Sequence, residues 1–419
     1  MSPSLLKGFE VEMYTGRPDG TVVGCSSEAA AAIEGIVTEP DRRNLEYITP
    51  PEASYQAQLK HLLEPRQRLR QWLQQRQLTL LPGSSLSLGD SHRFERSNPH
   101  NPYHQFIEDS YGTRVVTASV HINFGLESSE TIMAACRLLR CEAALLLALS
   151  ASSPFLDGQA TGAHSQRWRQ FPITPEQVPL FDSHQHYIEW MQTQLEQKQM
   201  RNVRHFWGAV RPNGPDRPQQ LNRVDLRVCD LVSDPRDLLA ITAFAELRLL
   251  QLIERGRSED PLHGSDLDAA ELAALADHND QQAAASSLDA ELRHWRDGRP
   301  ISARQWIHEQ IQDLKAWGDE QPAMTWLDRL PALLEHRQRL RQWLQQRQLT
   351  LLPGSSLSLG DSQRFERSNP DNPSPVHRGQ LRHPCGDRQR SHQLWPGEQR
   401  NDHGGLPAIA LRSRTAACP

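Results

Sequence analysis

Short stretches in which polar and apolar residues alternate constrain this 419-residue chain more than any other feature of its sequence. Three of them span residues 9–13 (FEVEM), 117–124 (TASVHINF) and 224–228 (VDLRV). Because successive side chains of a β-strand point to opposite faces, the polar residues of each stretch emerge together and the apolar ones face the other way. The pattern predicts a sheet with one apolar face on the core and one polar face.

A fourth stretch, residues 39–47, adds Glu39 and Glu46, seven positions apart. Any one stretch taken alone also fits the solvated face of an ordinary antiparallel strand. Four in one chain would crowd carboxylates on one face, where they repel one another unless cations lie between them. Oxygen ligands with one imidazole suit Mg²⁺ ions that bridge phosphate oxygens. We therefore predict six metal ligands: Glu10, Glu12, Glu39, Glu46, His121 and Asp225.

Three further roles follow from position on the same face. Arg227 lies two residues after Asp225, so it would point to the polar face and stabilise charge on a transferred phosphoryl group. His121 is expected to be a metal ligand or a catalytic phosphate contact, although a structural histidine is the alternative for this residue alone. Asn123, two residues further on, would orient the nucleotide through its amide.

The stretches also resemble a known family. GFEVEM (8–13), TEPDRRNLEYITPP (38–51), ASVHINFG (118–125), LALSASSPFLDGQATG (147–162) and RVDLRVCDLVSDP (223–235) are similar to the glutamate-cysteine ligases of the bacterial carboxylate-amine ligase type, most closely the cyanobacterial branch. The blocks occur in the family's order and spacing between Leu5 and Ile253, and a weaker helical continuation reaches Gly318.

The resemblance implies an α+β fold, with a glutamine-synthetase-like antiparallel sheet and helices packed on one side. It also implies ATP and Mg²⁺ as cofactors. The expected reaction joins the side-chain carboxylate of L-glutamate to the amine of L-cysteine through an acyl phosphate, the first step of glutathione biosynthesis. Alternatives are a ligase for another amine, a phosphagen-kinase-like phosphotransferase, and a non-catalytic product of a damaged gene.

By family position, Arg167 would bind the α-carboxylate of glutamate, because a planar guanidinium suits a carboxylate; a solvated loop arginine is the alternative. Arg211 is expected to contact the nucleotide. Thr161 is expected to bind substrate, although its hydroxyl could equally make a local turn bond. The family usually has glutamate where this chain has Asp225, so the shorter carboxylate must move closer to a metal or reach it through a water.

Composition fits this interpretation. With a net charge of −5 and a pI near 6.4, the chain is not expected to bind nucleic acid. No signal-like N-terminus and no long apolar run are present, so we expect a cytoplasmic protein without a membrane partner. The six cysteines lack disulfide-like or zinc-like spacing. The sequence does not set the oligomeric state.

A near-identical repeat dominates the C-terminal part. Residues 62–102 recur at 333–373, with differences only at Pro65/His336, His92/Gln363 and His100/Asp371. The tail after Pro373 can be read as the continuation of the same duplicated DNA in a shifted frame. For example, the codon of Met133 ends in G and the codon of Ala134 begins with GC, so the shifted codon is GGC, which encodes glycine. The tail has Gly404 at the corresponding position. We therefore divide the chain into a ligase domain (1–330), a duplicate (331–373) and an out-of-frame tail (374–419) that we expect to be disordered.

Periodicity adds a coarse outline of the remaining elements. Helices are predicted over 53–77, after a cap at Ser128 or Ser129, and after Asp234. Residues 257–268 are charged and marked by Gly and Pro, which predicts a mobile loop, and residues 269–318 are predicted to return to helix.

Overall fold

The computed structural model describes residues 4–318 and 321–335. Its largest sheet has the strand order β2-β3-β1-β5-β9-β8, and β4 pairs with β1 beside this path. All of these pairings are antiparallel. The strands are β1 (Lys7–Gly16), β2 (Ile36–Thr38), β3 (Asn44–Ile48), β4 (Thr79–Leu81), β5 (Val120–Gly125), β8 (Val210–Asn213) and β9 (Arg223–Leu226).

Helices and smaller elements surround this sheet. The α-helices are α1 (Ser26–Ala32), α2 (Tyr55–Gln74), α3 (Pro102–Tyr111), α4 (Ser129–Ser150), α5 (Gln166–Gln170), α6 (His184–Glu196), α7 (Pro235–Arg255), α8 (Pro261–Gly264), α9 (Ala269–Ser286), α10 (Ala303–Trp317) and α11 (Met324–Leu327). The 3-10 helices are η1 (Gly112–Val115), η2 (Val203–His205), η3 (Gly256–Ser258) and η4 (Ser287–Asp289). Two small hairpins are β6 (Phe155–Leu156) with β7 (Gln159–Ala160), and β10 (Glu291–Arg293) with β11 (Pro300–Ser302).

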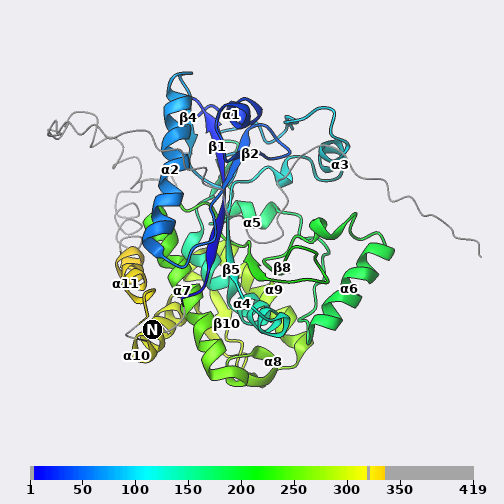
Figure 1. Cartoon of the computed structure of the whole chain (residues 1–419), viewed down its shortest axis with the longest axis vertical. Coiled ribbons are helices and arrows are strands. Elements are labelled where there is room, and N and C mark those ends of the chain that lie inside the picture. Colours follow the sequence, from blue (N-terminus) through cyan, green and yellow to red (C-terminus); the bar gives the residue numbers. More distant parts are fainter. Residues whose placement is uncertain (1–3, 319–320, 336–419) are drawn as a thin grey trace, which may run out of the picture.

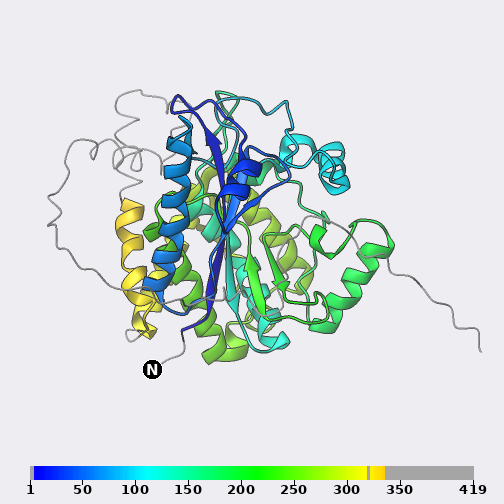
Figure 2. The ribbon, with the colours of Figure 1, turned by 45° about the horizontal axis from the view of Figure 1, so that its top comes forward.

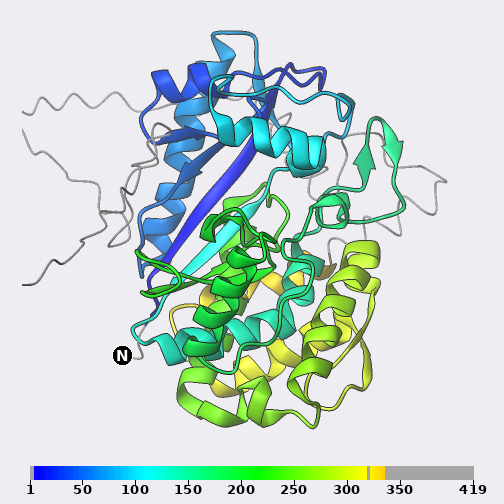
Figure 3. The ribbon, with the colours of Figure 1, turned by 90° about the vertical axis from the view of Figure 1, so that its right-hand side faces the viewer.

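The main helices cover one face of the sheet, as predicted. Figures 1 and 2 show α2 beside β1, on the same side as α10 and α11, whereas α3 and α6 lie on the other side. The alternating apolar residues Phe9, Val11, Ile122 and Leu226 are at most 1% exposed and belong to the core that α4 and α7 complete. Burial of this face leaves the other face of β1 and β5, which run side by side in Figure 3, to polar side chains.

The three long predicted helices are confirmed, with their caps. Ser54, Ser128 and Asp234 each accept a backbone N–H from the first turn of α2, α4 and α7. The first copy of the repeat lies within this structure: it supplies most of α2 and the whole of β4, whose Leu81 pairs with Tyr14 of β1.

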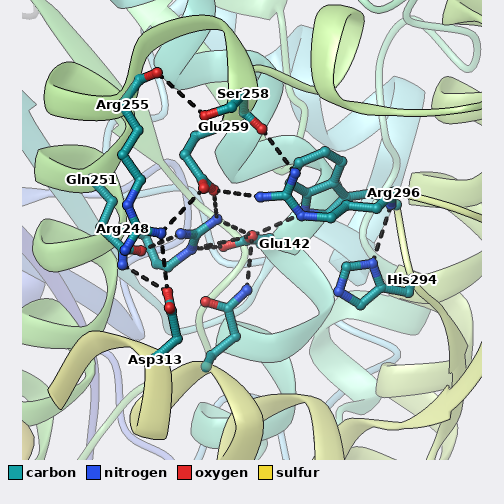
Figure 4. Close-up of polar contacts among 11 residues, drawn as sticks. Glu142, Arg248, Gln251, Arg255, Ser258, Glu259, His294, Arg296 and Asp313 are labelled. Atoms are coloured by element: carbon teal, nitrogen blue, oxygen red, sulfur yellow. Dashed lines mark hydrogen bonds and ion pairs between the residues drawn. The ribbon is translucent and has the colours of Figure 1, made fainter. Parts of the chain in front are cut away.

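The prediction of a loop over 257–268 is wrong. The segment contains α8 and part of η3, and Glu259 is only 4% exposed. Figure 4 shows why: Arg248 of α7 donates to both Glu142 of α4 and Glu259, and Arg296 also donates to Glu259. The predicted return to helix over 269–318 holds for α9 and α10, but the β10–β11 hairpin, which was not predicted, separates these two helices.

Two predictions concern residues that the structure covers only in part. Residues 336–419, which hold nearly all of the duplicate and the whole tail, lie outside the described residues, and the boundary at residue 330 stays a prediction.

Among the described residues, no helix has both the length and the apolar character needed to cross a membrane.

Candidate active site

Strand register brings the predicted polar residues into contact. Glu12 of β1 lies opposite Glu46 of β3, and Glu10 lies opposite His121 of β5. Further along the sheet, Asp225 of β9 lies between Asn123 of β5 and Arg211 of β8. Four separate stretches of sequence therefore meet on one face.

Glu12, Glu39 and Glu46 form the first acidic group, in which ligand oxygens of all three lie within 4.8 Å of one another. Glu39 directly follows β2, while Glu12 and Glu46 pair across β1 and β3. Burial, together with the charge of Glu12, raises the pKa of Glu39 to about 8. Burial and the surrounding glutamates, Glu39 first among them, raise the pKa of Glu46 well above its usual value.

Glu10, His121 and Asp225 form the second group, again with ligand atoms within 4.8 Å. Nδ1 of His121 donates to Oε2 of Glu10 over 2.6 Å, and Nδ2 of Asn123 donates to Oε1 of Glu10 over 3.2 Å. Nε2 of His121 lies 3.7 Å from Oε1 of Glu12, so the imidazole connects the two groups. Burial favours the neutral acid, but the hydrogen bond and charge of His121 outweigh it and lower the pKa of Glu10.

Arginines surround the Asp225 end of this face. Nε of Arg211 donates to Oδ2 of Asp225 over 2.8 Å, and Nη1 of Arg227 lies 3.5 Å from the same oxygen. Burial opposes ionisation of Asp225, yet these two cations keep its pKa below its usual value. Burial and the nearby charges of Arg227 and Arg217 lower the pKa of Arg211 to about 9. The site thus has an acidic end and a basic end.

The residues present fit divalent cations. Six oxygen or nitrogen ligands lie in two compact groups, and the carboxylates of the first group oppose one another's ionisation. Asp225 is fully buried, and within the described part of the chain its Oδ1 atom has no hydrogen-bond partner. A cation between these carboxylates would remove the repulsion, and hard oxygen ligands suit Mg²⁺.

Arg167 and Thr161 are engaged away from these groups. The guanidinium of Arg167 is 2% exposed and donates to the backbone carbonyls of Val228 and Arg227 over 3.1 and 2.9 Å. The Thr161 hydroxyl donates to the Pro154 carbonyl and accepts from a backbone N–H two residues later, which is the local turn bond of the alternative interpretation. Substrate contacts of Arg167 and Thr161 stay predictions.

Sequence reasoning missed two residues on the polar face. Ser119 donates to Oε2 of Glu12 over 2.7 Å and lies 3.2 Å from Nε2 of His121. Arg223 donates to Oδ1 of Asn123 over 3.1 Å. Both stand two positions before a predicted ligand, so the alternation that singled out His121 and Asp225 also contained the signal for them.

Comparison with known proteins decides the family. A family model described as glutamate-cysteine ligase family 2 matches residues 6–380. The chain belongs to this family. The resemblance found in the sequence blocks is therefore confirmed.

Curated relatives agree with this assignment. "Putative glutamate--cysteine ligase 2-1" of Rubrobacter xylanophilus is 27% identical over 243 residues, which cover 56% of this chain and 61% of the relative. "Putative glutamate--cysteine ligase 2" of Gloeobacter violaceus is 25% identical over 276 residues, 62% of this chain and 70% of the relative. The match to the Rubrobacter protein thus spans less than two thirds of its length.

Solved structures show the same fold. A glutamate–cysteine ligase of Francisella tularensis, solved in complex with AMP, superposes with a TM-score of 0.63 at 14% identity and covers 79% of this chain and 81% of that one. A bifunctional glutathione synthetase of Pasteurella multocida superposes with a TM-score of 0.59 at 18% identity and covers 88% of this chain and 50% of that one. The glutamine-synthetase-like fold class of this family 2 member is confirmed.

Proposed function

We propose that this chain is an ATP-dependent ligase that joins the side-chain carboxylate of L-glutamate to the amine of L-cysteine, giving γ-glutamylcysteine. The observation that carries the proposal is the contact of His121 with carboxylates of both acidic groups, beside Arg211 of β8 and Arg227, which directly follows β9. Such a face can hold a polyphosphate through cations at one end and guanidinium groups at the other. Family membership supports glutamate and cysteine as the substrates.

The reaction proceeds in two transfers. A carboxylate is a poor electrophile, so an oxygen of the glutamate side chain first takes the γ-phosphoryl group of ATP and ADP leaves. The cysteine amine then attacks the acyl carbon, phosphate departs with the carbon–oxygen bond electrons, and the amine loses a proton. Phosphoryl transfer depends mainly on alignment and charge neutralisation.

Side chains of this protein can provide both the alignment and the charge neutralisation. Arg227 and Arg211, held at Asp225, neutralise charge on the transferred phosphoryl group and on the acyl phosphate. His121 is held between Glu10 and Glu12, so its imidazole has a fixed position against the phosphate. Mg²⁺, held by the six predicted ligands, would supply further neutralisation between the phosphates. Asn123, bonded to Glu10, fixes the carboxylate that faces His121.

Phosphate release from ATP tests the proposal. With glutamate, cysteine and Mg²⁺ all present the parent should turn over, and omission of either amino acid should stop it. Glu12→Gln, which removes charge at nearly constant volume, should lower kcat/KM at least about 100-fold, close to 3 kcal/mol in transition-state stabilisation. Glu28→Gln, at an acid whose side chain is 54% exposed, is the control and should remain active.

Other outcomes contradict parts of the proposal. Turnover with another amine but not cysteine would overturn the acceptor. A stable phosphorylated guanidino product would overturn ligation in favour of phosphotransfer. Activity of Glu12→Gln within about threefold of the parent would remove Glu12 from the metal ligands.

A further inference from the structure

Asp230, four residues after the end of β9, is a fully buried carboxylate that organises the loop before α5. It accepts hydrogen bonds from the backbone N–H of Ser152 at 2.8 Å, the hydroxyl of Ser153 at 2.7 Å and the hydroxyl of Ser165 at 2.8 Å. Three donors on one carboxylate fix both ends of the segment between residues 152 and 165. Asp230 is thus the centre of a polar network inside the protein.

The network leads directly to Arg167. The hydroxyl of Ser165 accepts the N–H of Trp168 and begins α5, and the hydroxyl of Ser153 accepts the N–H of Arg167 over 3.1 Å. Nη1 of Arg167 lies 4.0 Å from Oδ1 of Asp230. Asp230 therefore holds both the backbone and the side-chain charge of this arginine.

Arg167 connects this network to the backbone of Arg227, at the basic end of the site. Its two Nη atoms donate to the backbone carbonyls of Arg227 and Val228. These are the first two residues after β9, the strand that carries Asp225. Nη1 of Arg227 in turn lies 3.5 Å from Oδ2 of Asp225 and 3.2 Å from Nδ1 of His121. A shift of the backbone at Arg227 would move its guanidinium away from both.

A second connection runs across the sheet. Ser119 forms an isolated antiparallel bridge with Asp230, and its hydroxyl donates to Glu12. The same hydroxyl lies 3.2 Å from Nε2 of His121. Asp230 is therefore connected to the basic end through its carboxylate and to the acidic end through its backbone pairing with Ser119.

We propose that Asp230 is a positioning residue: through Ser153, Ser165 and Arg167 it holds the backbone of Arg227, and so places that guanidinium against the reacting phosphoryl group. The inference rests on the proposed ligase function and identifies what aligns its catalytic cation. Loss of this alignment removes an interaction made in the transition state, so it lowers kcat more than it raises KM.

Asp230→Asn keeps the shape of the side chain but replaces one acceptor oxygen with an amide N–H₂, which faces donors instead of accepting from them. The control variant is Glu246→Gln. Glu246 is equally buried and accepts from Leu5 N–H and the Tyr55 hydroxyl while pairing with Lys7, outside the site. Asp230→Asn should lower kcat at least about tenfold with KM values for ATP and glutamate within about threefold, whereas Glu246→Gln should lose thermal stability but keep kcat. Arg167→Lys should also lower kcat at least about tenfold.

Hydrogen exchange gives a readout that does not need turnover. Backbone amides of 152–168 and 227–231 should exchange faster in Asp230→Asn than in the parent or in Glu246→Gln. Equal exchange, unchanged kcat, or a rise in glutamate KM alone would each overturn the positioning role. A parent without turnover on glutamate and cysteine would overturn the proposed function, while the exchange comparison would still decide whether Asp230 organises this network.

Discussion

Glu12 and Glu46 face each other directly across the β1–β3 pair, although both are less than 10% exposed. Like charges directly opposite one another on adjacent strands destabilise a sheet, and burial increases the cost because ionised carboxylates lose their hydration. Glu39 adds a third carboxylate within ligand distance. A sheet built in this way gains stability from any cation that binds between the three.

Glu46→Gln should therefore raise the stability of the metal-free protein and reduce the stabilisation that Mg²⁺ provides. In EDTA the variant should melt several degrees above the parent, because one of three opposed carboxylates is gone. In Mg²⁺ the parent should gain stability as RT ln(1 + [Mg²⁺]/Kd), and the variant should gain less. Thermal melts over a Mg²⁺ series measure both effects.

The surface variant Glu28→Gln controls for a general change in charge and should show neither effect. If Glu46→Gln instead melts below the parent in EDTA and responds to Mg²⁺ as the parent does, the three glutamates do not form a metal site.

Asp225→Glu tests the departure from the family pattern. The longer carboxylate should reach a cation directly, so half-maximal activity should need about threefold less Mg²⁺. The expectation is based on the Oδ1 atom, which is buried and without a partner in the described structure while Oδ2 is held by Arg211. Titration of phosphate release against Mg²⁺ provides the measurement.

Asp260→Glu is the matched control, because Asp260 is also buried and paired with an arginine, Arg137, outside the site. An unchanged Mg²⁺ dependence of Asp225→Glu would place Asp225 outside the metal ligands.

Alternation along strands made much of the polar face predictable. Glu10 and Glu12, or His121 and Asn123, stand two apart, and a strand has only two faces, so their common side follows from local sequence. Which strand pairs with which is non-local information. The contact between Glu12 and Glu46 depends on register across β1 and β3, and no feature of either stretch alone determines it.

The segment 257–268 shows the opposite case. Its Gly, Pro and charged residues have the composition of an exposed loop, and yet Glu259 is buried because Arg248 and Arg296 come from other elements to neutralise it. Asp230 was overlooked for the same reason: its three donors, Ser152, Ser153 and Ser165, lie more than 60 residues earlier in the chain. A charged residue looks exposed in the sequence, and its burial cannot be predicted when the groups that neutralise or bind it come from other elements of the fold.

Asp280 of α9 should make stability depend on pH. It is 4% exposed, and burial, with the charge of Asp277 adding and that of Arg140 opposing, raises its pKa to about 8. Between an unfolded-state pKa of about 3.9 and this value, the folded protein holds a proton that the unfolded chain has lost. The contribution of Asp280 to stability is therefore fully present at low pH and falls as pH rises toward 8.

Asp280→Asn cannot ionise, so its melting temperature relative to the parent should rise steadily from pH 5 to pH 8 and then level off. Thermal melts at several pH values test this, with Asp289→Asn, an exposed aspartate, as the control that should show no such trend. A constant difference across this range would mean that Asp280 titrates normally.

Deletion of 349–419 should leave the chemistry unchanged. Every residue assigned to the active site lies between Glu10 and Arg227, and the first copy of the repeat already provides β4 against β1. We predict from the sequence that residues 374–419 are an out-of-frame tail. Such a tail would not have been selected for apolar periodicity, so we expect its removal to cost no core contact. Phosphate release and thermal melts of the truncated chain should match those of the full chain within about twofold in kcat/KM. If the truncated protein unfolds, or is soluble but has lost turnover while deletion of 374–419 alone has no effect, then the second copy of the repeat contributes to the folded enzyme.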